Sequence, residues 1–209
     1  GRWPNGTPLA LFPDAPGPEV DQDADAFSYG ANDDSFGNRC PIGSHIRRSN
    51  PRDTALPVPH DPELSGDPAA DPKLRAERLK FTSRHRILRR GRAYGPPVDE
   101  DYDIDALRTQ SSSEERGLHF LCFNANLARQ FEFVQSNWVQ NPSFAGLSSD
   151  PDPLVGADRK VPFRARDFTL QGCPVRRVRE LPRVVETRGG AYFFMPSRRA
   201  LEFLARERP

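Results

Sequence analysis

Prolines limit the length of every regular element in this chain. There are 22 of them among 209 residues, about twice the average share. A proline inside a helix or a central strand removes a backbone donor and breaks the element. The sequence therefore predicts short helices and strands joined by long loops. Hydrophobic residues make up 36% of the chain, which at this length suffices for the core of one large domain or two small ones.

Charge and cysteine usage narrow the class of protein. Lys and Arg number 30 against 29 Asp and Glu, so the chain lacks the strong positive field of a general nucleic-acid binder. No run approaches the roughly 18 apolar residues of a membrane span. The three cysteines form no CxxC pair and no disulfide framework, which favours a reducing, cytoplasmic location. The first residues, GRWPNG, have no initiating Met and no signal-peptide pattern, so we expect a piece of a longer polypeptide.

Composition suggests how the chain is organised. Residues 1–40 are rich in Pro, Gly, Asp and Asn, which predicts an extended linker and inter-domain segment. We expect residues 41–209 to form one domain. Within it, the Asp-Pro-rich stretch 54–80 and the acidic stretch 96–115 predict solvated loop insertions.

The remaining segments carry recognisable periodicities. HRILRRGRAYG and GLHFLCFNA predict a short strand and a buried strand. Apolar residues at steps of three to four predict a helix from Asn126 to about Asn141, where Pro142 ends it. VVETRGGAYFFMPS predicts a hairpin around Gly189 and Gly190, and SRRALEFLAR a closing helix with Ser197 as its N-cap. The mixture predicts an α+β fold.

Two basic motifs are candidates for chemistry. In CPIGSHIRRSNPRD, residues 40–53, a histidine precedes three arginines, so an imidazole could bind a metal while the guanidiniums bind carboxylates or phosphates. The alternative is a surface turn with a hydrogen-bonded histidine, which residue types alone favour. RHRILRRGRAYG, residues 84–95, is either an anion-binding patch or the solvated face of a strand. His60 and His119 have no partner pattern, and we expect an exposed and a core histidine respectively.

Six blocks in order give the chain a resemblance to a known family. GRWPNGTPL, CPIGSHIRRSNPRD, HRILRRGRAYG, RGLHFLCFNANLARQFEFVQSNW, DPLVG and GGAYFFMPS cover nearly the whole chain. Together they resemble the C-terminal half of dye-decolourising (DyP-type) haem peroxidases. The resemblance implies a ferredoxin-like antiparallel sheet with helices on one face, haem b as cofactor, and hydrogen peroxide as the oxidant of dyes and phenols.

The resemblance also implies roles for single residues. His45 matches the proximal iron ligand, and Arg89 matches the distal arginine that assists peroxide cleavage. The second ring nitrogen of a ligating histidine commonly donates to a carboxylate, for which Asp152 is the first candidate. Further residues are implied to contact the haem or to be alternatives to Asp152. They are Arg47 at a propionate; Asn50, Pro51 and Arg52 along the haem; Leu118 and Phe120 over its distal face; and Asp158 and Glu132 as alternatives.

One family motif is absent. The distal aspartate of a GxxDG motif lies in the N-terminal half of the family, and no GxxDG occurs here. We expect a separate N-terminal chain to supply it in a heterodimer, produced by a split gene or by proteolytic nicking. The alternative is that this chain is a truncated piece of one polypeptide. Alternative functions are a non-catalytic haem-binding module and, from another class, an anion-binding module built on the two basic motifs. Aromatic residues that could relay electrons, or simply pack, are Trp3, Trp138, Tyr94, Tyr102 and Tyr192.

Overall fold

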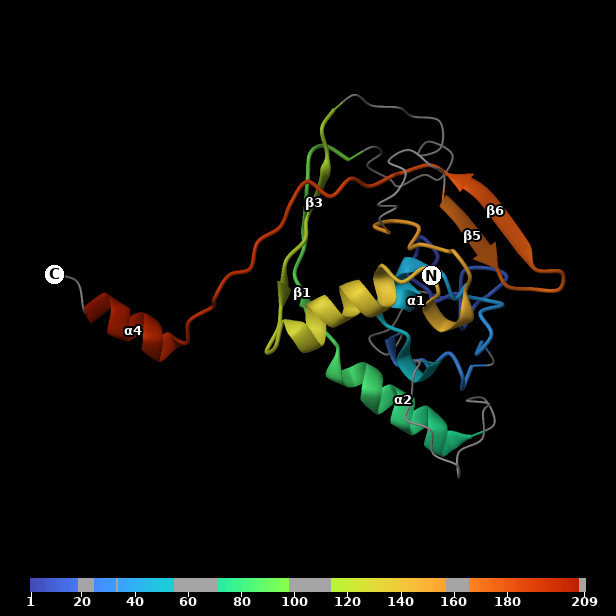
Figure 1. Cartoon of the computed structure of the whole chain (residues 1–209), viewed down its shortest axis with the longest axis horizontal. Coiled ribbons are helices and arrows are strands. Elements are labelled where there is room, and N and C mark those ends of the chain that lie inside the picture. Colours follow the sequence, from blue (N-terminus) through green and yellow to red (C-terminus); the bar gives the residue numbers. More distant parts are fainter. Residues whose placement is uncertain (19–24, 33, 55–70, 98–113, 157–165, 207–209) are drawn as a thin grey trace.

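Short elements joined by loops make up the molecule (Figure 1). The computed structural model describes residues 1–18, 25–32, 34–54, 71–97, 114–156 and 166–206. These residues form helices and small antiparallel sheets, so the predicted α+β class is confirmed. His60, Tyr102 and Asp158 fall outside them, as do most of the two predicted insertions. Within the described residues, no helix is both long enough and apolar enough to span a bilayer.

The first basic motif folds as a single short helix. α1 spans His45–Ser49, and the 3-10 turn η2 spans Arg52–Thr54. Asn50 leaves the helical region with φ −150° and ψ 80°, because a following proline, here Pro51, disfavours helical backbone before it. The motif therefore places His45 at the first position of a helix one turn long.

Helix α2, Pro72–Arg84, corrects the prediction that residues 54–80 are a loop insertion. The Asp71 carboxylate accepts hydrogen bonds from the backbone N–H groups of Lys73 and Leu74 at 2.9 and 3.3 Å. Proline is favoured at the first helical position, where its missing N–H costs nothing. The last Asp-Pro pair of the stretch is thus an N-cap and helix start, which composition alone does not reveal. The Thr82 hydroxyl then donates to the Arg52 carbonyl at 2.6 Å, joining α2 to η2.

A long antiparallel ribbon follows α2. β1, Leu88–Arg89, pairs with β4, Cys122–Phe123, and β2, Arg92–Tyr94, pairs with β3, Gly117–His119. The predicted strands are therefore confirmed, but they are not buried, since Leu118 is 61% exposed. His119 is exposed as well, so its prediction as a core residue is wrong.

The predicted helix after the ribbon is confirmed, with wider turns than expected. η3, Ala128–Glu132, and η4, Val134–Val139, are both π-helical and continuous through Phe133. Val134, Trp138 and Val139 form the centre of the core with Phe144. Trp138 is one of the proposed electron relays, and the structure places it in this packing.

The second half of the chain completes the fold. The 3-10 turn η5, Phe144–Gly146, leads to β5, Arg166–Leu170, and β6, Arg176–Leu181, which pair antiparallel. The described strands thus form three separate two-stranded sheets rather than one continuous sheet. Helices beside small antiparallel sheets agree with the predicted α+β class, although each sheet is smaller than we expected.

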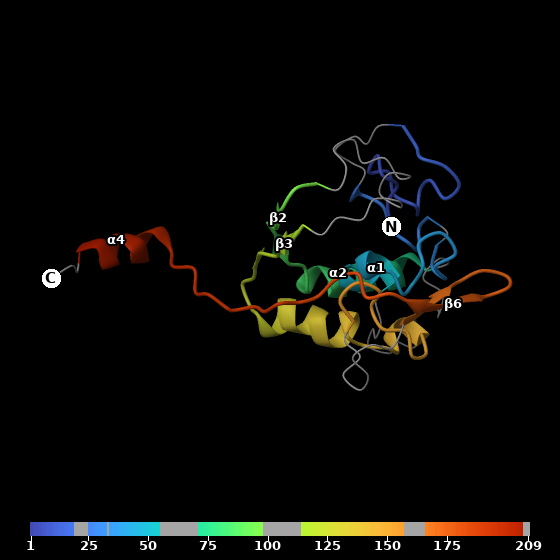
Figure 2. The same ribbon diagram turned by 90° about the horizontal axis from the view of Figure 1, so that it is seen from above.

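The C-terminal arm, residues 182–206, runs from β6 past the ribbon and η3 and then extends outward to α4, Arg198–Arg206 (Figures 1 and 2). Along this path the Tyr192 ring lies 6.2 Å from that of Phe131, measured between centroids. Residues 182–196 contain no strand, so the hairpin predicted around Gly189 and Gly190 is wrong. The closing helix is confirmed as α4, Arg198–Arg206, and the backbone N–H of Ala200 donates to the Ser197 hydroxyl at 3.2 Å. Phe193 and Phe194 are each 88% exposed. A strand at this position has nothing to pair with among the described residues.

Candidate functional site

His45 and Asp152 form the most distinctive polar pair in the structure. Nδ1 of His45 lies 2.9 Å from Oδ2 of Asp152. The Asp152 side chain is fully buried, whereas the His45 side chain is 36% exposed. Of the two acidic candidates within the described residues, Asp152 is the one that the structure brings to His45. Glu132 lies exposed on η3.

A tight turn after Asp152 fixes its carboxylate. Oδ1 accepts hydrogen bonds from the backbone N–H groups of Leu154 and Val155, both at 2.9 Å. Burial works to raise the pKa of Asp152, but the hydrogen bonds from His45 and from these N–H groups outweigh it and hold the pKa below its ordinary value. Asp152 is therefore ionised at neutral pH and accepts the hydrogen bond.

The ionised acceptor determines the tautomer of His45. Because Asp152 cannot donate, Nδ1 of the imidazole carries the proton. Nε2 has no hydrogen-bond partner among the described residues, so its lone pair is available to an external partner. A histidine with a buried carboxylate behind it and an available second nitrogen has the donor arrangement of a metal ligand. Among the described residues, no group of three or more His, Cys, Asp or Glu side chains could hold a metal ion.

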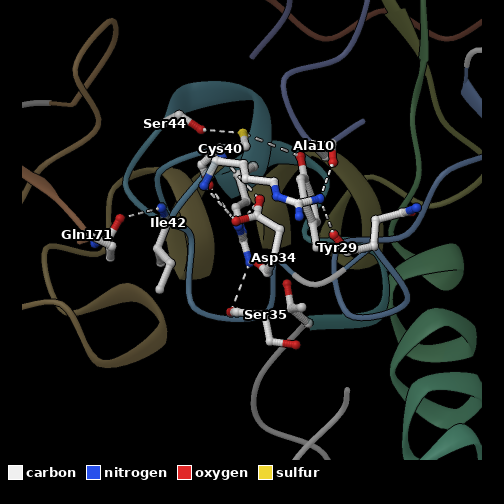
Figure 3. Close-up of polar contacts among 12 residues, drawn as sticks. Ala10, Tyr29, Asp34, Ser35, Cys40, Ile42, Ser44 and Gln171 are labelled. Carbon is white, nitrogen blue, oxygen red and sulfur yellow. Dashed lines mark hydrogen bonds and ion pairs between the residues drawn. The ribbon is translucent and has the colours of Figure 1, made fainter. Parts of the chain in front are cut away.

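Arg47 lies in a buried cluster rather than at a free surface. Its guanidinium donates to the Asp34 carboxylate at 3.1 Å and to the Cys40 carbonyl at 2.7 Å. It also donates to the carbonyls of Asp34 and Ser35, and it lies 4.1 Å from the ring centroid of Tyr29. Figure 3 shows Asp34 and Cys40 at the centre of this cluster. With a guanidinium this fully used and 1% exposure, Arg47 does not fit the expected propionate contact. Its contacts hold Tyr29, Asp34, Ser35 and Cys40 against α1.

The NPR segment, Asn50–Arg52, which directly follows α1, also carries an arginine that binds groups within the protein. Arg52 donates to the carbonyls of Asp25 and Phe27 at 2.7 and 2.6 Å and lies over the Phe27 ring. It therefore points to the N-terminal segment, which does not fit the expected position along a haem. Pro51 is buried. Oδ1 of Asn50 is buried with no hydrogen-bond partner, so of the three residues Asn50 has an acceptor that a bound group could satisfy.

The predicted distal residues share one element, the β1 to β4 ribbon. Arg89 lies on β1 opposite Cys122, and its exposed guanidinium has no partner among the described residues. Leu118 and Phe120 are exposed on and just after β3. The structure thus brings Arg89, Leu118 and Phe120 together on the ribbon and His45 with Asp152 at α1. Within the described part of the chain, no hydrogen bond or ring contact joins the two groups.

Comparison with known proteins shows which family the chain is similar to. No protein-family model matches the chain. It is 33% identical over 201 residues to the multifunctional dye peroxidase DyP2 of Amycolatopsis sp., which covers 94% of this chain and 38% of that protein. It is 30% identical over 206 residues to the dye-decolorizing peroxidase AauDyP1 of Auricularia auricula-judae, covering 94% and 36%. The chain is similar to the C-terminal half of dye-decolourising peroxidases.

Solved dye-decolourising peroxidases share the fold. A structure from work on asymmetric sulfoxidation by engineering of a heme pocket superposes with a TM-score of 0.64 at 26% identity, covering 91% of this chain and 40% of that chain. The resemblance drawn from the six sequence blocks is therefore confirmed. The chain spans 36 to 39% of the length of the curated relatives it matches.

Dye-decolourising peroxidases are haem enzymes, and part of the site fits that group. The exposed edge of His45, the ionised Asp152 behind it and the orphaned Oδ1 of Asn50 are compatible with an iron porphyrin placed against α1. The guanidiniums of Arg47 and Arg52 form hydrogen bonds within the protein, so they do not point to the cofactor. The fit therefore rests on His45 and Asp152 rather than on the arginines of the motif.

Sequence reasoning assigned no role to Arg48 and His85, which are both buried. Arg48 is fully buried, and its hydrogen bonds go to carbonyl groups. From the sequence alone it could not be distinguished from its neighbour Arg47. His85 is buried and stacks on Phe133 with 3.7 Å between ring centroids.

Proposed function

We propose that this chain is the haem-binding part of a dye-decolourising peroxidase, which uses hydrogen peroxide to oxidise dyes, phenols and similar reductants. The observation that carries the proposal is the His45–Asp152 hydrogen bond of 2.9 Å, with the second ring nitrogen left available. The similarity to named dye peroxidases over 94% of the chain supports it. The reaction and substrates are those of the longer relatives, of which the chain covers about two fifths.

His45 and Asp152 would hold the cofactor. His45 would bind the iron through Nε2, and the haem, when bound, supplies the redox chemistry. Asp152 keeps the proton on Nδ1, fixes the ring orientation and makes the imidazole a stronger donor. A buried, ionised carboxylate does this without moving, because its own hydrogen bonds to Leu154 and Val155 hold it.

The ribbon would provide the opposite side of the site. Arg89 is permanently charged, and its guanidinium would stabilise negative charge that develops on the leaving oxygen of a peroxide. Leu118 and Phe120 would exclude water from that charge, which strengthens the interaction. Support for this assignment comes from their common ribbon and from the absence of a described partner for the Arg89 guanidinium.

We further propose that a separate N-terminal polypeptide completes the site and brings the aspartate that takes the peroxide proton. Monomeric proteins rarely expose large apolar patches, and this chain exposes many large apolar side chains on the ribbon and the arm. These include Leu118, Phe120, Leu121, Phe123, Leu127, Phe193, Phe194, Met195, Leu201, Phe203 and Leu204. Intact mass spectrometry of the enzyme from its native source should find a second polypeptide with this chain. A single longer chain would contradict the separate partner.

A haem titration tests the cofactor assignment. The wild-type chain should bind haem and develop a Soret band, and His45→Ala should lose both. His119→Ala is the matched control, because His119 is an exposed histidine on β3 and should bind haem as the wild type does. Normal haem binding by His45→Ala would show that another residue is the ligand.

A second candidate is a non-catalytic haem-binding module, favoured by the absence of GxxDG from this sequence. Rapid mixing with hydrogen peroxide separates the two. A peroxidase should form a high-valent iron species when the complete, haem-loaded protein is mixed with peroxide, and a carrier should not. An anion-binding module is disfavoured, since Arg47 and Arg52 are engaged inside the protein.

A further inference from the structure

Arg48 connects the two halves of the His45–Asp152 pair. It lies in α1, one helical turn after His45, and it is 0% exposed. Among the described residues, its guanidinium donates hydrogen bonds to main-chain carbonyls alone, and it lies 5.3 Å from the ring centroid of Phe144. The acceptors are the carbonyl oxygens of Gly43 at 2.9 Å, Trp138 at 3.2 Å, Asn141 at 2.7 Å and Asp150.

These carbonyls belong to separate segments. Gly43 precedes α1, whereas Trp138 lies in the last turn of η4 and Asn141 just after its C-cap Gln140, where carbonyls lack partners within the helix. Asp150 lies two residues before Asp152 in the loop that follows η5. One guanidinium thus joins α1, which carries the imidazole, to the loop that carries its carboxylate.

The Asp150 segment is held from its other side as well. Its buried carboxylate accepts a hydrogen bond from the backbone N–H of Thr169 at 3.1 Å and lies 3.4 Å from Arg177. The side chain of Asp150 therefore faces β5 and β6 while its carbonyl faces Arg48. Asp150 is held on both sides, and Asp152 is held by its own turn. The position of the Asp152 carboxylate relative to α1 is therefore fixed.

We propose that Arg48 is a positioning residue, which sets the placement of Asp152 against His45. It does not touch a substrate or cofactor; it acts through the loop. The hydrogen bond between His45 and Asp152 forms across 107 residues of sequence, so its length depends on how α1 and the loop are joined. The consequence for haem chemistry rests on the proposed function, but the geometric claim holds for the protein without haem.

Arg47 provides a matched control within the same helix. It is adjacent, equally buried and equally engaged, but its acceptors are Asp34, Ser35 and Cys40 in the N-terminal segment. Arg47→Lys should therefore destabilise the fold as Arg48→Lys does. It should not release the loop of Asp152.

The experiment measures the His45–Asp152 hydrogen bond itself. In the full chain without haem, the Nδ1–H proton of His45 should give a slowly exchanging NMR resonance, because a buried carboxylate accepts it. Arg48→Lys is expected to abolish this resonance, and Arg47→Lys is expected to keep it although both variants melt at lower temperature. An unchanged resonance in folded Arg48→Lys would overturn the proposal.

A wild-type measurement covers the case in which Arg48→Lys does not fold. The guanidinium protons of Arg48 should exchange with water far more slowly than those of the exposed Arg89. Equal exchange rates would overturn the proposal without any variant. A wild-type chain that binds no haem while Arg48→Lys loses the Nδ1–H resonance would contradict the proposed function and leave the positioning role supported.

Discussion

His45 Nδ1 and Asp152 Oδ2 lie 2.9 Å apart, and the two side chains differ sharply in their exposure to water. Asp152 is sealed in the protein and held by two backbone N–H groups, while one edge of His45 faces outward. This asymmetry fixes which nitrogen of the imidazole carries a proton. Because Nδ1 carries the proton, the lone pair of the neutral imidazole lies on Nε2, the nitrogen that does not face Asp152.

Asp152→Asn tests the value of the charge in this pair. The amide preserves the shape of the side chain but removes the negative charge, so the hydrogen bond from His45 becomes a neutral one. Hydrogen bonds to charged groups contribute about 1.5 to 3 kcal/mol and neutral ones about 1 kcal/mol. We expect a loss of about 1 kcal/mol or more in the free energy of unfolding and weaker haem binding. Denaturant titration and haem titration measure the two effects, and an unchanged haem affinity would contradict the role assigned to Asp152.

Acid should weaken the fold through the same carboxylate. Because the pKa of Asp152 is lower in the folded chain than its ordinary value of 3.8, the unfolded chain binds the proton more tightly. Asp152 therefore contributes stability above about pH 3.8, and this stability is lost as the pH falls through the folded pKa. Unfolding curves between pH 6 and pH 2 should show a smaller decline for Asp152→Asn than for the wild type. Parallel curves would mean that other carboxylates dominate.

The sequence predicted the local elements and the pairing of His45 with Asp152, but not the fate of the arginines. Hydrophobic spacing and capping residues are local signals, so the helix after Asn126 and the Ser197 cap could be read directly. The engagement of Arg47 with Asp34 depends on where the N-terminal loop packs, and no local pattern encodes that. The same holds for α2, since its Asp71 cap lies inside a run of Asp-Pro pairs that is typical of loops.

The exposed ribbon and arm explain another failure of sequence reasoning. GLHFLCFNA has the apolar content of a buried strand, and we expected one there; we expected GGAYFFMPS to form part of a hairpin. Leu118 and Phe193 are instead exposed among the described residues. A pattern of apolar residues predicts that a face is covered, but it does not say by which polypeptide.

Arg89→Leu tests the assignment of the ribbon to peroxide activation. In the complete, haem-loaded enzyme we expect normal haem content and a rate of peroxide reaction lower by about 100-fold or more, the effect of removing one charge-stabilising donor. Stopped-flow absorbance measures the rate. Arg90→Leu is the control, since Arg90 is the exposed neighbour and should retain the wild-type rate. Equal rates in wild type and Arg89→Leu would show that a different group acts on the peroxide.

Asp71→Ala tests the start of α2. Loss of an N-cap carboxylate costs about 1 kcal/mol, and α2 packs against η2 directly after the NPR segment. We expect the melting temperature to fall by several degrees, without loss of haem binding. Glu77→Ala, an exposed position on the same helix, should leave the melting temperature almost unchanged. A melting temperature for Asp71→Ala as high as that of Glu77→Ala would show that the cap does not matter.

Tyr29→Phe tests the buried cluster around Arg47 at high pH. Burial and, after it, the neighbouring Cys40 raise the pKa of Tyr29 well above its ordinary value of 10.0. Above pH 10 the unfolded chain loses the phenol proton while the folded chain keeps it, so Tyr29 makes stability fall by up to about 1.4 kcal/mol per pH unit. Below pH 10 its contribution is constant. Denaturant unfolding from pH 8 to pH 11 should therefore decline more steeply in the wild type than in Tyr29→Phe, and Tyr94→Phe, a substitution on the exposed ribbon, should follow the wild type. If Tyr29→Phe also follows the wild type, the phenol ionises as readily in the folded chain as in the unfolded one, and burial does not keep it protonated.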